Sequence, residues 1–189
     1  MAERYDRTLK DIFAVQDEIT KKIITALQVK LTEGEQASHQ AKGTDNLEAY
    51  LKFLQGHYYW QKLTPDDNVR VRQLAEEIIA LDPEYPKGYL LLGLVNLSDA
   101  WFGLSKAPNK SIEQVLKFAQ KVISLDDSDP DGYFLLGGAY LHMKQHDKSI
   151  AAREQALALN PNHADYLHVL GTSLLFAGLS LIHISEPTR

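Results

Sequence analysis

The sequence contains no cysteine among its 189 residues. Disulfide bonds, thiolate metal sites and a cysteine nucleophile are therefore excluded from this chain. Lack of cysteine is compatible with a reducing compartment. The first residues, MAERYDRTLKD, are charged where an export signal needs an apolar core, so no such signal is visible. Together these features predict a cytoplasmic location.

The sequence also lacks an excess of positive charge, because its formal net charge is -5. Proteins that bind nucleic acids use clustered Lys and Arg to replace the counterions of the phosphates, so we expect no nucleic-acid partner. Hydrophobic residues make up 44% and charged residues 24%, which is ordinary for a folded chain and argues against disorder or a fibrous class.

Long apolar runs are scarce as well. Residues 166–185 carry no formal charge, but they include polar side chains such as Thr172, Ser173, Ser180 and His183. The first half of this stretch also follows the helical pattern described below. We therefore expect no membrane insertion by this chain.

Catalytic and metal-binding motifs are missing too. His142 and His146 have the spacing of two ligands on one helix, but a polar turn at residues 144–147 separates them, so their rings should diverge. Glu76 and Glu77 are adjacent carboxylates that would point about 100° apart on a helix, which is unsuitable for a joint acid and base. No phosphate-binding glycine loop or nucleophile elbow occurs. We predict no catalytic residue, cofactor or metal.

An internal repeat is the strongest feature that is present. Residues 131–161 contain two segments with helical apolar spacing on either side of a polar turn, which predicts an antiparallel helical hairpin. Leu136-Gly137 in this unit recurs as Leu170-Gly171, 34 residues later, and as Leu92-Gly93, 44 residues earlier. One hairpin cannot bury its own apolar faces, whereas stacked copies can. The repeat therefore predicts an all-α stack of hairpins.

The repeat divides the chain into three predicted regions. Residues 46–180 form the array, with units at about 46–83, 86–127 and 130–161 and a half unit at 163–178. The second unit contains about ten additional residues near positions 99–109, where a loop tolerates extra length. Trp101 and Phe102 lie in this insertion, and we expect other residues to cover them.

The two ends differ from the array. Residues 1–45 are predicted to hold an amphipathic helix at 11–31 and a polar linker. Residues 181–189, LIHISEPTR, break the pattern and resemble a translated sequencing adapter, so we predict a non-native tail. The apolar stripe of the predicted helix consists of Ile12, Val15, Ile19, Ile23, Ala26 and Leu27.

The third unit has an aromatic residue, then Leu-Gly, a further aromatic residue, a small residue on the second helix and a proline at the exit, namely Tyr133, Leu136, Gly137, Tyr140, Ala156 and Pro161. With this pattern the unit resembles the tetratricopeptide repeat. Ser149 and Arg153 depart from the pattern, because the family prefers a small and an aromatic residue there. The resemblance implies a right-handed superhelix, an α-solenoid of antiparallel hairpins.

A narrower resemblance covers most of the chain. The stretches ERYDRTLKDIFAVQDEITKKIITAL, DNLEAYLKFLQGHYYWQKLTPDD and ALDPEYPKGYLLLG occur in this order. They are similar to the segment that precedes tetratricopeptide repeats in bacterial proteins with a class III nucleotide cyclase, a winged-helix regulator or a protein kinase. This resemblance implies the regulatory region of a signalling protein. None of the metal-binding carboxylates of the cyclase has a match here.

The resemblance also implies a concave groove lined by the first helix of each hairpin, where partners bind. The candidate residues lack the Lys and Asn set by which some tetratricopeptide domains hold a terminal carboxylate. We therefore predict an apolar peptide or a neighbouring domain of the same parent chain as the partner. The candidate groove residues are Tyr50, Phe53, His57, Trp60, Leu90, Leu94, Leu97, Phe134, Leu141, His142 and His168.

Three functional hypotheses follow. The leading one is a non-catalytic protein–protein interaction scaffold within a larger bacterial signalling protein. The alternative is a self-association module that forms a homo-oligomer through the open fourth unit or the stripe at residues 11–31. The least favoured is a small hydrolase that uses His and carboxylate residues.

Overall fold

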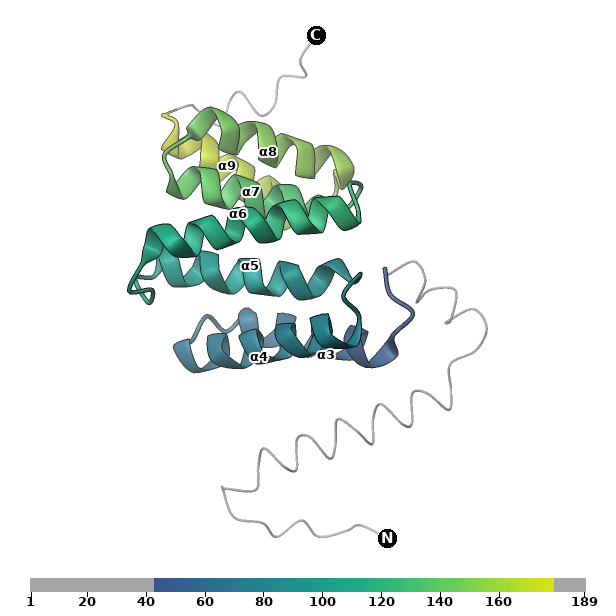
Figure 1. Ribbon diagram of the computed structural model, residues 1–189. Helices are drawn as coiled ribbons and strands as arrows, with labels where there is room; N and C mark the ends of the chain where they lie inside the picture. The colour runs from purple at the N-terminus through teal and green to yellow at the C-terminus, as the bar shows by residue number, and fades with distance from the viewer. Residues whose placement is uncertain (1–42, 179–189) are drawn as a thin grey trace, which may run out of the picture.

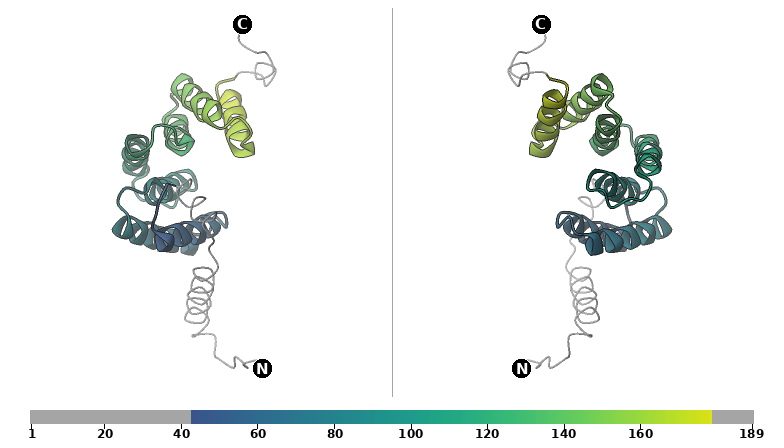
Figure 2. Two further views of the ribbon diagram at one scale, coloured as in Figure 1. Left: turned by 90° about the vertical axis from the view of Figure 1, so that its right-hand side faces the viewer. Right: turned by 90° about the vertical axis from the view of Figure 1, so that its left-hand side faces the viewer.

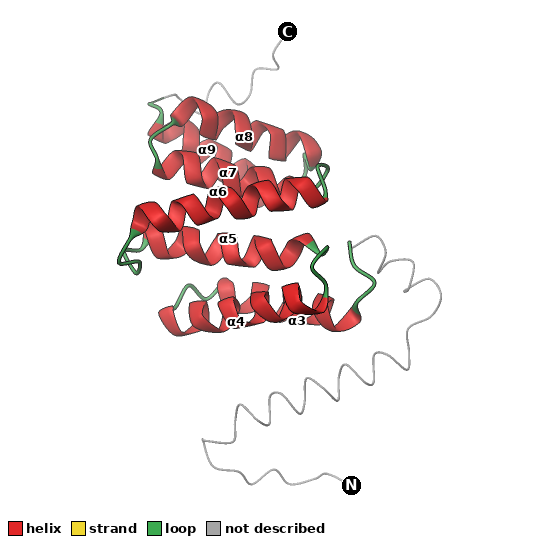
Figure 3. Cartoon of the chain, in the orientation of Figure 1, coloured by secondary structure: helices red, strands yellow, loops and turns green. Residues whose placement is uncertain are grey.

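The computed structural model describes residues 43–178, and within this range the chain forms seven α-helices and no strand (Figures 1 and 3). The helix predicted at residues 11–31 and the tail predicted at 181–189 lie outside the described residues. The helices are α3 (Leu47–Trp60), α4 (Pro65–Leu81), α5 (Pro86–Trp101), α6 (Pro108–Leu125), α7 (Pro130–His142), α8 (His146–Leu159) and α9 (Ala164–Phe176).

Proline marks the start of four of these helices, namely α4, α5, α6 and α7. At the first helical position proline loses no helical hydrogen bond, and its fixed φ suits the helix. At α4 the preceding residue, Thr64, caps the helix, because its hydroxyl oxygen accepts a hydrogen bond of 3.1 Å from the backbone N–H of Asp67. Proline and capping residues therefore fix where these helices begin.

Consecutive helices pack as antiparallel pairs, α3 with α4, α5 with α6 and α7 with α8, and each pair packs on the next. The first helices also contact one another, α3 with α5, α5 with α7 and α7 with α9. Seen from the side, the stack bends into an arc with α3 and α9 at its two ends (Figure 2). The predicted fold class, an all-α stack of helical hairpins, is confirmed.

The leucines that defined the repeat occupy equivalent places. Leu92, Leu136 and Leu170 are each the seventh residue of α5, α7 and α9. Leu92 and Leu170 are buried and Leu136 is partly buried. The same register in three helices means that one packing geometry is repeated along the stack.

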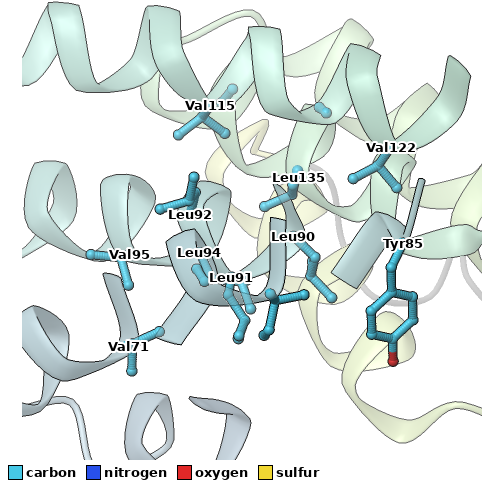
Figure 4. Packing of buried hydrophobic residues seen from close by; sticks show 14 of the residues in the cluster. Val71, Tyr85, Leu90, Leu91, Leu92, Leu94, Val95, Val115, Val122 and Leu135 are labelled. Carbon is cyan, nitrogen blue, oxygen red and sulfur yellow. The ribbon is translucent and has the colours of Figure 1, made fainter. Parts of the chain in front are cut away.

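Glycine allows the first helices to approach closely. A Cβ atom on Gly93 would lie 2.5 Å from Cδ1 of Leu135, and one on Gly56 would lie 2.6 Å from Cδ1 of Leu91. Leu91 and Leu135 are fully buried in a core that continues through successive pairs (Figure 4). Each Leu side chain therefore fills the space that the preceding glycine leaves open.

The insertion in the second unit lengthens the helices more than the loop. Helices α5 and α6 have 16 and 18 residues, whereas α7 and α8 have 13 and 14. The expectation that Trp101 and Phe102 are covered is wrong, because they are 43% and 59% exposed. Trp101 lies nine residues after Leu92, and the equivalent position in the next unit, Gln145, is already past the end of α7. The ring of Trp101 therefore meets only the last residues of α7 and α9, with ring centroids 5.5 Å from His142 and 6.3 Å from Phe176, and it stays partly exposed.

Within the described range, every helix is too short or too polar to cross a lipid bilayer.

Candidate functional site

A cavity of about 740 Å³ lies between α3, α5, α7 and α9. All four are first helices, so the cavity is on the inner side of the arc (Figure 2). Its lining combines apolar and aromatic side chains with a few charged groups, a composition typical of ligand-binding clefts.

One wall of the cavity is apolar. It is formed by Phe53 and Trp60 of α3, Leu90 and Leu94 of α5, and Phe134 of α7. The indole N–H of Trp60 donates a hydrogen bond of 3.2 Å to the Ser98 hydroxyl, which holds the ring against α5. The wall is therefore built from rings and branched chains in fixed positions.

A polar corner lies beside this wall and joins three repeats. Nζ of Lys87 donates to Oδ2 of Asp129 at 2.7 Å and to Oδ2 of Asp131 at 2.6 Å. The hydroxyl of Tyr166 donates to Oδ1 of Asp131 at 2.7 Å. Asp129 also caps α7, since its Oδ1 accepts from the backbone N–H of Asp131. The cluster thus links the first turns of α5, α7 and α9.

Two carboxylates in this corner share one ammonium group. Burial alone would lower the pKa of Lys87, but the charges of Asp131 and Asp129 raise it above its ordinary value. Burial raises the pKa of Asp129, and the charge of Asp131 adds to this effect although Lys87 opposes it. Burial also raises the pKa of Tyr166, as does the charge of Asp131. The two carboxylates of Asp129 and Asp131 therefore exceed the single positive charge of Lys87.

Two histidines that line the cavity have buried nitrogens with no hydrogen-bond partner among the described residues. They are Nδ1 of His57 and Nδ1 of His163. The other ring nitrogen of His57 lies 3.1 Å from the Gln61 side chain, and the ring of His163 stacks on Tyr166 with centroids 4.1 Å apart. Each free nitrogen can accept or donate one hydrogen bond, depending on the tautomer.

The structure brings together most, but not all, of the predicted groove residues. Tyr50, Leu97, Leu141 and His142 do not line the cavity. Leu97 and Leu141 belong to the interior, since a Cβ on Gly138 would lie 2.5 Å from Leu97 and Leu141 is buried. The predicted residues that line it are Phe53, His57, Trp60, Leu90, Leu94, Phe134 and His168.

Sequence reasoning missed the polar corner. Lys87, Asp131 and Asp165 are each the second residue of their helices, α5, α7 and α9, and have the same 44- and 34-residue spacing as the Leu-Gly landmarks. This spacing could have revealed that the three side chains share an edge of the stack. The prediction instead used residues near the glycines, one or two turns further along each helix.

A buried cation lies behind the apolar wall. Arg153 of α8 is only 4% exposed, and its guanidinium is 4.6 Å from the centre of the Phe134 ring. Its Nε and Nη1 have no hydrogen-bond partner among the described residues. Burial lowers the pKa of Arg153 to about 10. This residue stands where the tetratricopeptide pattern has an aromatic side chain, so a charge occupies a core position.

No group of three or more His, Asp or Glu side chains within residues 43–178 is arranged to hold a metal ion.

A solved structure with a similar fold is the first TPR of Spaghetti (RPAP3) bound to the HSP90 peptide SRMEEVD. The TM-score is 0.52 and the identity is 16%, over 71% of this chain and 99% of that chain. This chain has the tetratricopeptide-repeat fold. The predicted resemblance to that repeat is therefore confirmed for the fold of the array.

A relative in sequence is "Putative adenylate cyclase 3" of Rhizobium meliloti, which is 36% identical over 98 residues. The match covers 52% of this chain and 17% of that protein, so the chain spans only a small part of the relative's length. This relative agrees with the predicted resemblance to a repeat region linked to nucleotide cyclases. No family model matches the sequence.

Proposed function

We propose that this chain is a non-catalytic interaction region of a larger bacterial signalling protein, and that its tetratricopeptide array binds a peptide segment in the cavity. The cavity itself carries this proposal, because its apolar wall is built from the first helices of successive repeats. A segment laid across these helices would cover the partly buried rings of Phe53, Trp60 and Phe134 together.

The larger protein is proposed from the cyclase relative. The shared region is a minor part of that protein, which leaves room for an effector domain elsewhere in it. By analogy, the array would regulate an attached effector, with adenylate cyclase as the favoured class. The bound segment would belong to the parent chain itself or to another protein.

A peptide is favoured over a small molecule for a structural reason. The cavity is open to the inner side of the arc and extends over four helices, so an extended segment can contact several repeats at once. The similar solved domain holds a peptide. Its low identity to this chain supports a shared fold, and the peptide itself is carried over only as part of this proposal.

Selection from a displayed library of random heptapeptides, using the purified chain as bait, tests the proposal. The groove variant is His57→Glu, and the matched control is Tyr58→Glu, whose side chain is exposed on the same helix and does not line the cavity. We expect the wild type and Tyr58→Glu to enrich the same peptides and His57→Glu to lose them.

Circular dichroism of each variant separates loss of binding from loss of folding. If folded His57→Glu enriches the same peptides as the wild type, the bound segment does not lie in this cavity. If no peptide is enriched by the wild type above a matrix control, peptide binding by this array is refuted.

Self-association is the second candidate, and the exposed face of α9 favours it. Leu175 and Phe176 are 60% and 59% exposed, and α9 is the last helix of the described range. Light scattering on the wild type and on the double variant Leu175→Ser and Phe176→Ser tests this. A concentration-dependent dimer that the double variant abolishes would support it, and a wild-type monomer at high concentration would refute it.

A further inference from the structure

We infer that the bound segment carries a basic side chain, Lys or Arg, beside an apolar anchor residue. This inference rests on the proposed function and concerns the chemistry of the partner. The basic side chain would lie at the polar corner of the cavity, near Asp131 and Asp165, while the apolar anchor would contact the wall formed by Phe53, Leu90 and Phe134.

The position of the polar corner follows from the repeat. Lys87, Asp131 and Asp165 each occupy the second position of a first helix, and these helices stack side by side. Their side chains therefore follow one edge of the cavity, next to its apolar wall. A segment that crosses the repeats would meet this edge along with the wall.

The charges along this edge do not balance. The described residues that line the cavity include the carboxylates of Asp129, Asp131 and Asp165 but only one lysine, Lys87. Lys87 is already bonded to both Asp129 and Asp131. Asp165 forms no hydrogen bond or ion pair with any described residue. A cation from the partner would thus find carboxylates that the protein itself leaves in excess.

Arg153 forms no ion pair with these carboxylates. Its guanidinium lies on the ring of Phe134, and its side chain is buried between α7 and α8. Arg153 is not among the residues that line the cavity. The ring of Phe134 therefore separates this cation from a bound segment.

An acidic peptide would fit this cavity poorly. The peptide SRMEEVD in the similar solved structure carries two Glu and one Asp against a single Arg, so it is acidic overall. Comparable carboxylates bound here would be repelled by Asp131 and Asp165. Lys87 is already paired with Asp129 and Asp131. The partner of this array should therefore differ in charge from that peptide.

The displayed heptapeptide library also tests this inference, through the composition of the peptides selected by the wild type and lost by His57→Glu. We expect Lys or Arg beside an apolar residue in most of them. Asp165→Lys should shift the selection toward Asp and Glu. Asp147→Lys is the matched control, because Asp147 is exposed on α8 and does not line the cavity, so it should leave the composition unchanged.

A direct measurement uses two labelled probes, SRMEEVD and SRMKKVK, in which Lys replaces both Glu and the Asp while the Arg is kept. Fluorescence anisotropy should show at least about tenfold tighter binding of the basic probe to the wild type, with the preference reduced by added salt. Equal binding, or tighter binding of SRMEEVD, would overturn the inference.

The two proposals fail in different ways. Groove-dependent peptides without basic residues, or an unchanged selection by folded Asp165→Lys, would refute the basic side chain and leave the peptide-binding function standing. The absence of any groove-dependent peptide would refute both.

Discussion

Arg153 of α8 is buried and holds its guanidinium 4.6 Å from the centre of the Phe134 ring of α7. The contact replaces the ring-on-ring packing that an aromatic residue at position 153 would make. It also leaves a charged group in the core without a carboxylate partner among the described residues. Attraction between the cation and the ring offsets only part of the cost of removing the charge from water.

We therefore expect Arg153→Met to stabilise the protein. Methionine fills a similar elongated space without a charge, and replacing a desolvated ion by an apolar side chain is often stabilising, here by about 1–3 kcal/mol. Urea denaturation at pH 7 measures the free energy of unfolding. Arg153→Lys keeps the charge and should give no increase. A loss of stability in Arg153→Met would mean that the contact with Phe134 outweighs the desolvation.

The stabilisation by Arg153→Met should depend on pH in a defined direction. Burial lowers the pKa of Arg153 in the folded protein to about 10, below its ordinary value of 12.5. The buried charge therefore costs stability at every pH below about 10, and this cost falls as the pH rises through that value. The difference in the free energy of unfolding between Arg153→Met and the wild type should be constant from pH 6 to 8 and smaller near pH 10.5. A difference that grows with pH would contradict this account.

Close packing between α5 and α7 predicts a strong effect of Gly93→Ala. The added Cβ would lie 2.5 Å from Cδ1 of the fully buried Leu135, so we expect a loss of about 1–3 kcal/mol in the free energy of unfolding. Leu135→Ala alone should cost about 2–5 kcal/mol.

The double variant is the control for Gly93→Ala. Without the Leu135 side chain the new Cβ meets no obstacle, so the double variant should be more stable than the sum of the two single losses implies. Strict additivity in guanidinium denaturation would show that Gly93→Ala acts through something other than contact with Leu135.

Removal of Lys87 should be costly, because it leaves Asp129 and Asp131 close together with no cation between them. We expect Lys87→Met to lower the free energy of unfolding by about 3–5 kcal/mol at pH 7. The raised pKa of Lys87 keeps its ammonium charged, and stabilising, throughout the neutral range, and this contribution is lost only as the pH rises through that pKa.

Acidification should reduce the loss in Lys87→Met, because protonation of the two carboxylates removes their repulsion. Lys52→Met is the matched control. Lys52 forms an exposed ion pair of 2.7 Å with Glu77, and losing it should cost at most about 1 kcal/mol. Equal losses in the two variants would show that burial of the Lys87 cluster has no energetic consequence.

The turn between α7 and α8 predicts a stabilising glycine. Lys144 has a φ of 58°, a left-handed conformation that is unfavourable for residues with a side chain. Lys144→Gly should raise the free energy of unfolding by about 0.5–1 kcal/mol, after allowing for the greater freedom of glycine in the unfolded chain. Thermal unfolding measures the change. Lys144→Val, which is β-branched, should lower the midpoint, and a higher midpoint for Val would contradict the explanation.

Helical register explains which parts of the groove could be foreseen. Phe53, Leu94 and Phe134 lie on the inner side of the first helices and line the cavity. Leu97 and Leu141 are on the same helices but do not line the cavity, and Leu97 lies instead against Gly138 of α7. Register along one helix does not reveal how near the next helix lies, so core and cavity residues could not be separated from the sequence.

The sequence by itself determined that the chain forms stacked helical hairpins, because the apolar spacing and the Leu-Gly landmarks act locally and recur at fixed intervals. Only the tertiary structure decided that Lys87 bridges Asp129 and Asp131 beside a cavity and that Arg153 lies on Phe134. These relations depend on how far each hairpin is rotated against the next. That rotation is set by the summed contacts of many side chains across the stack.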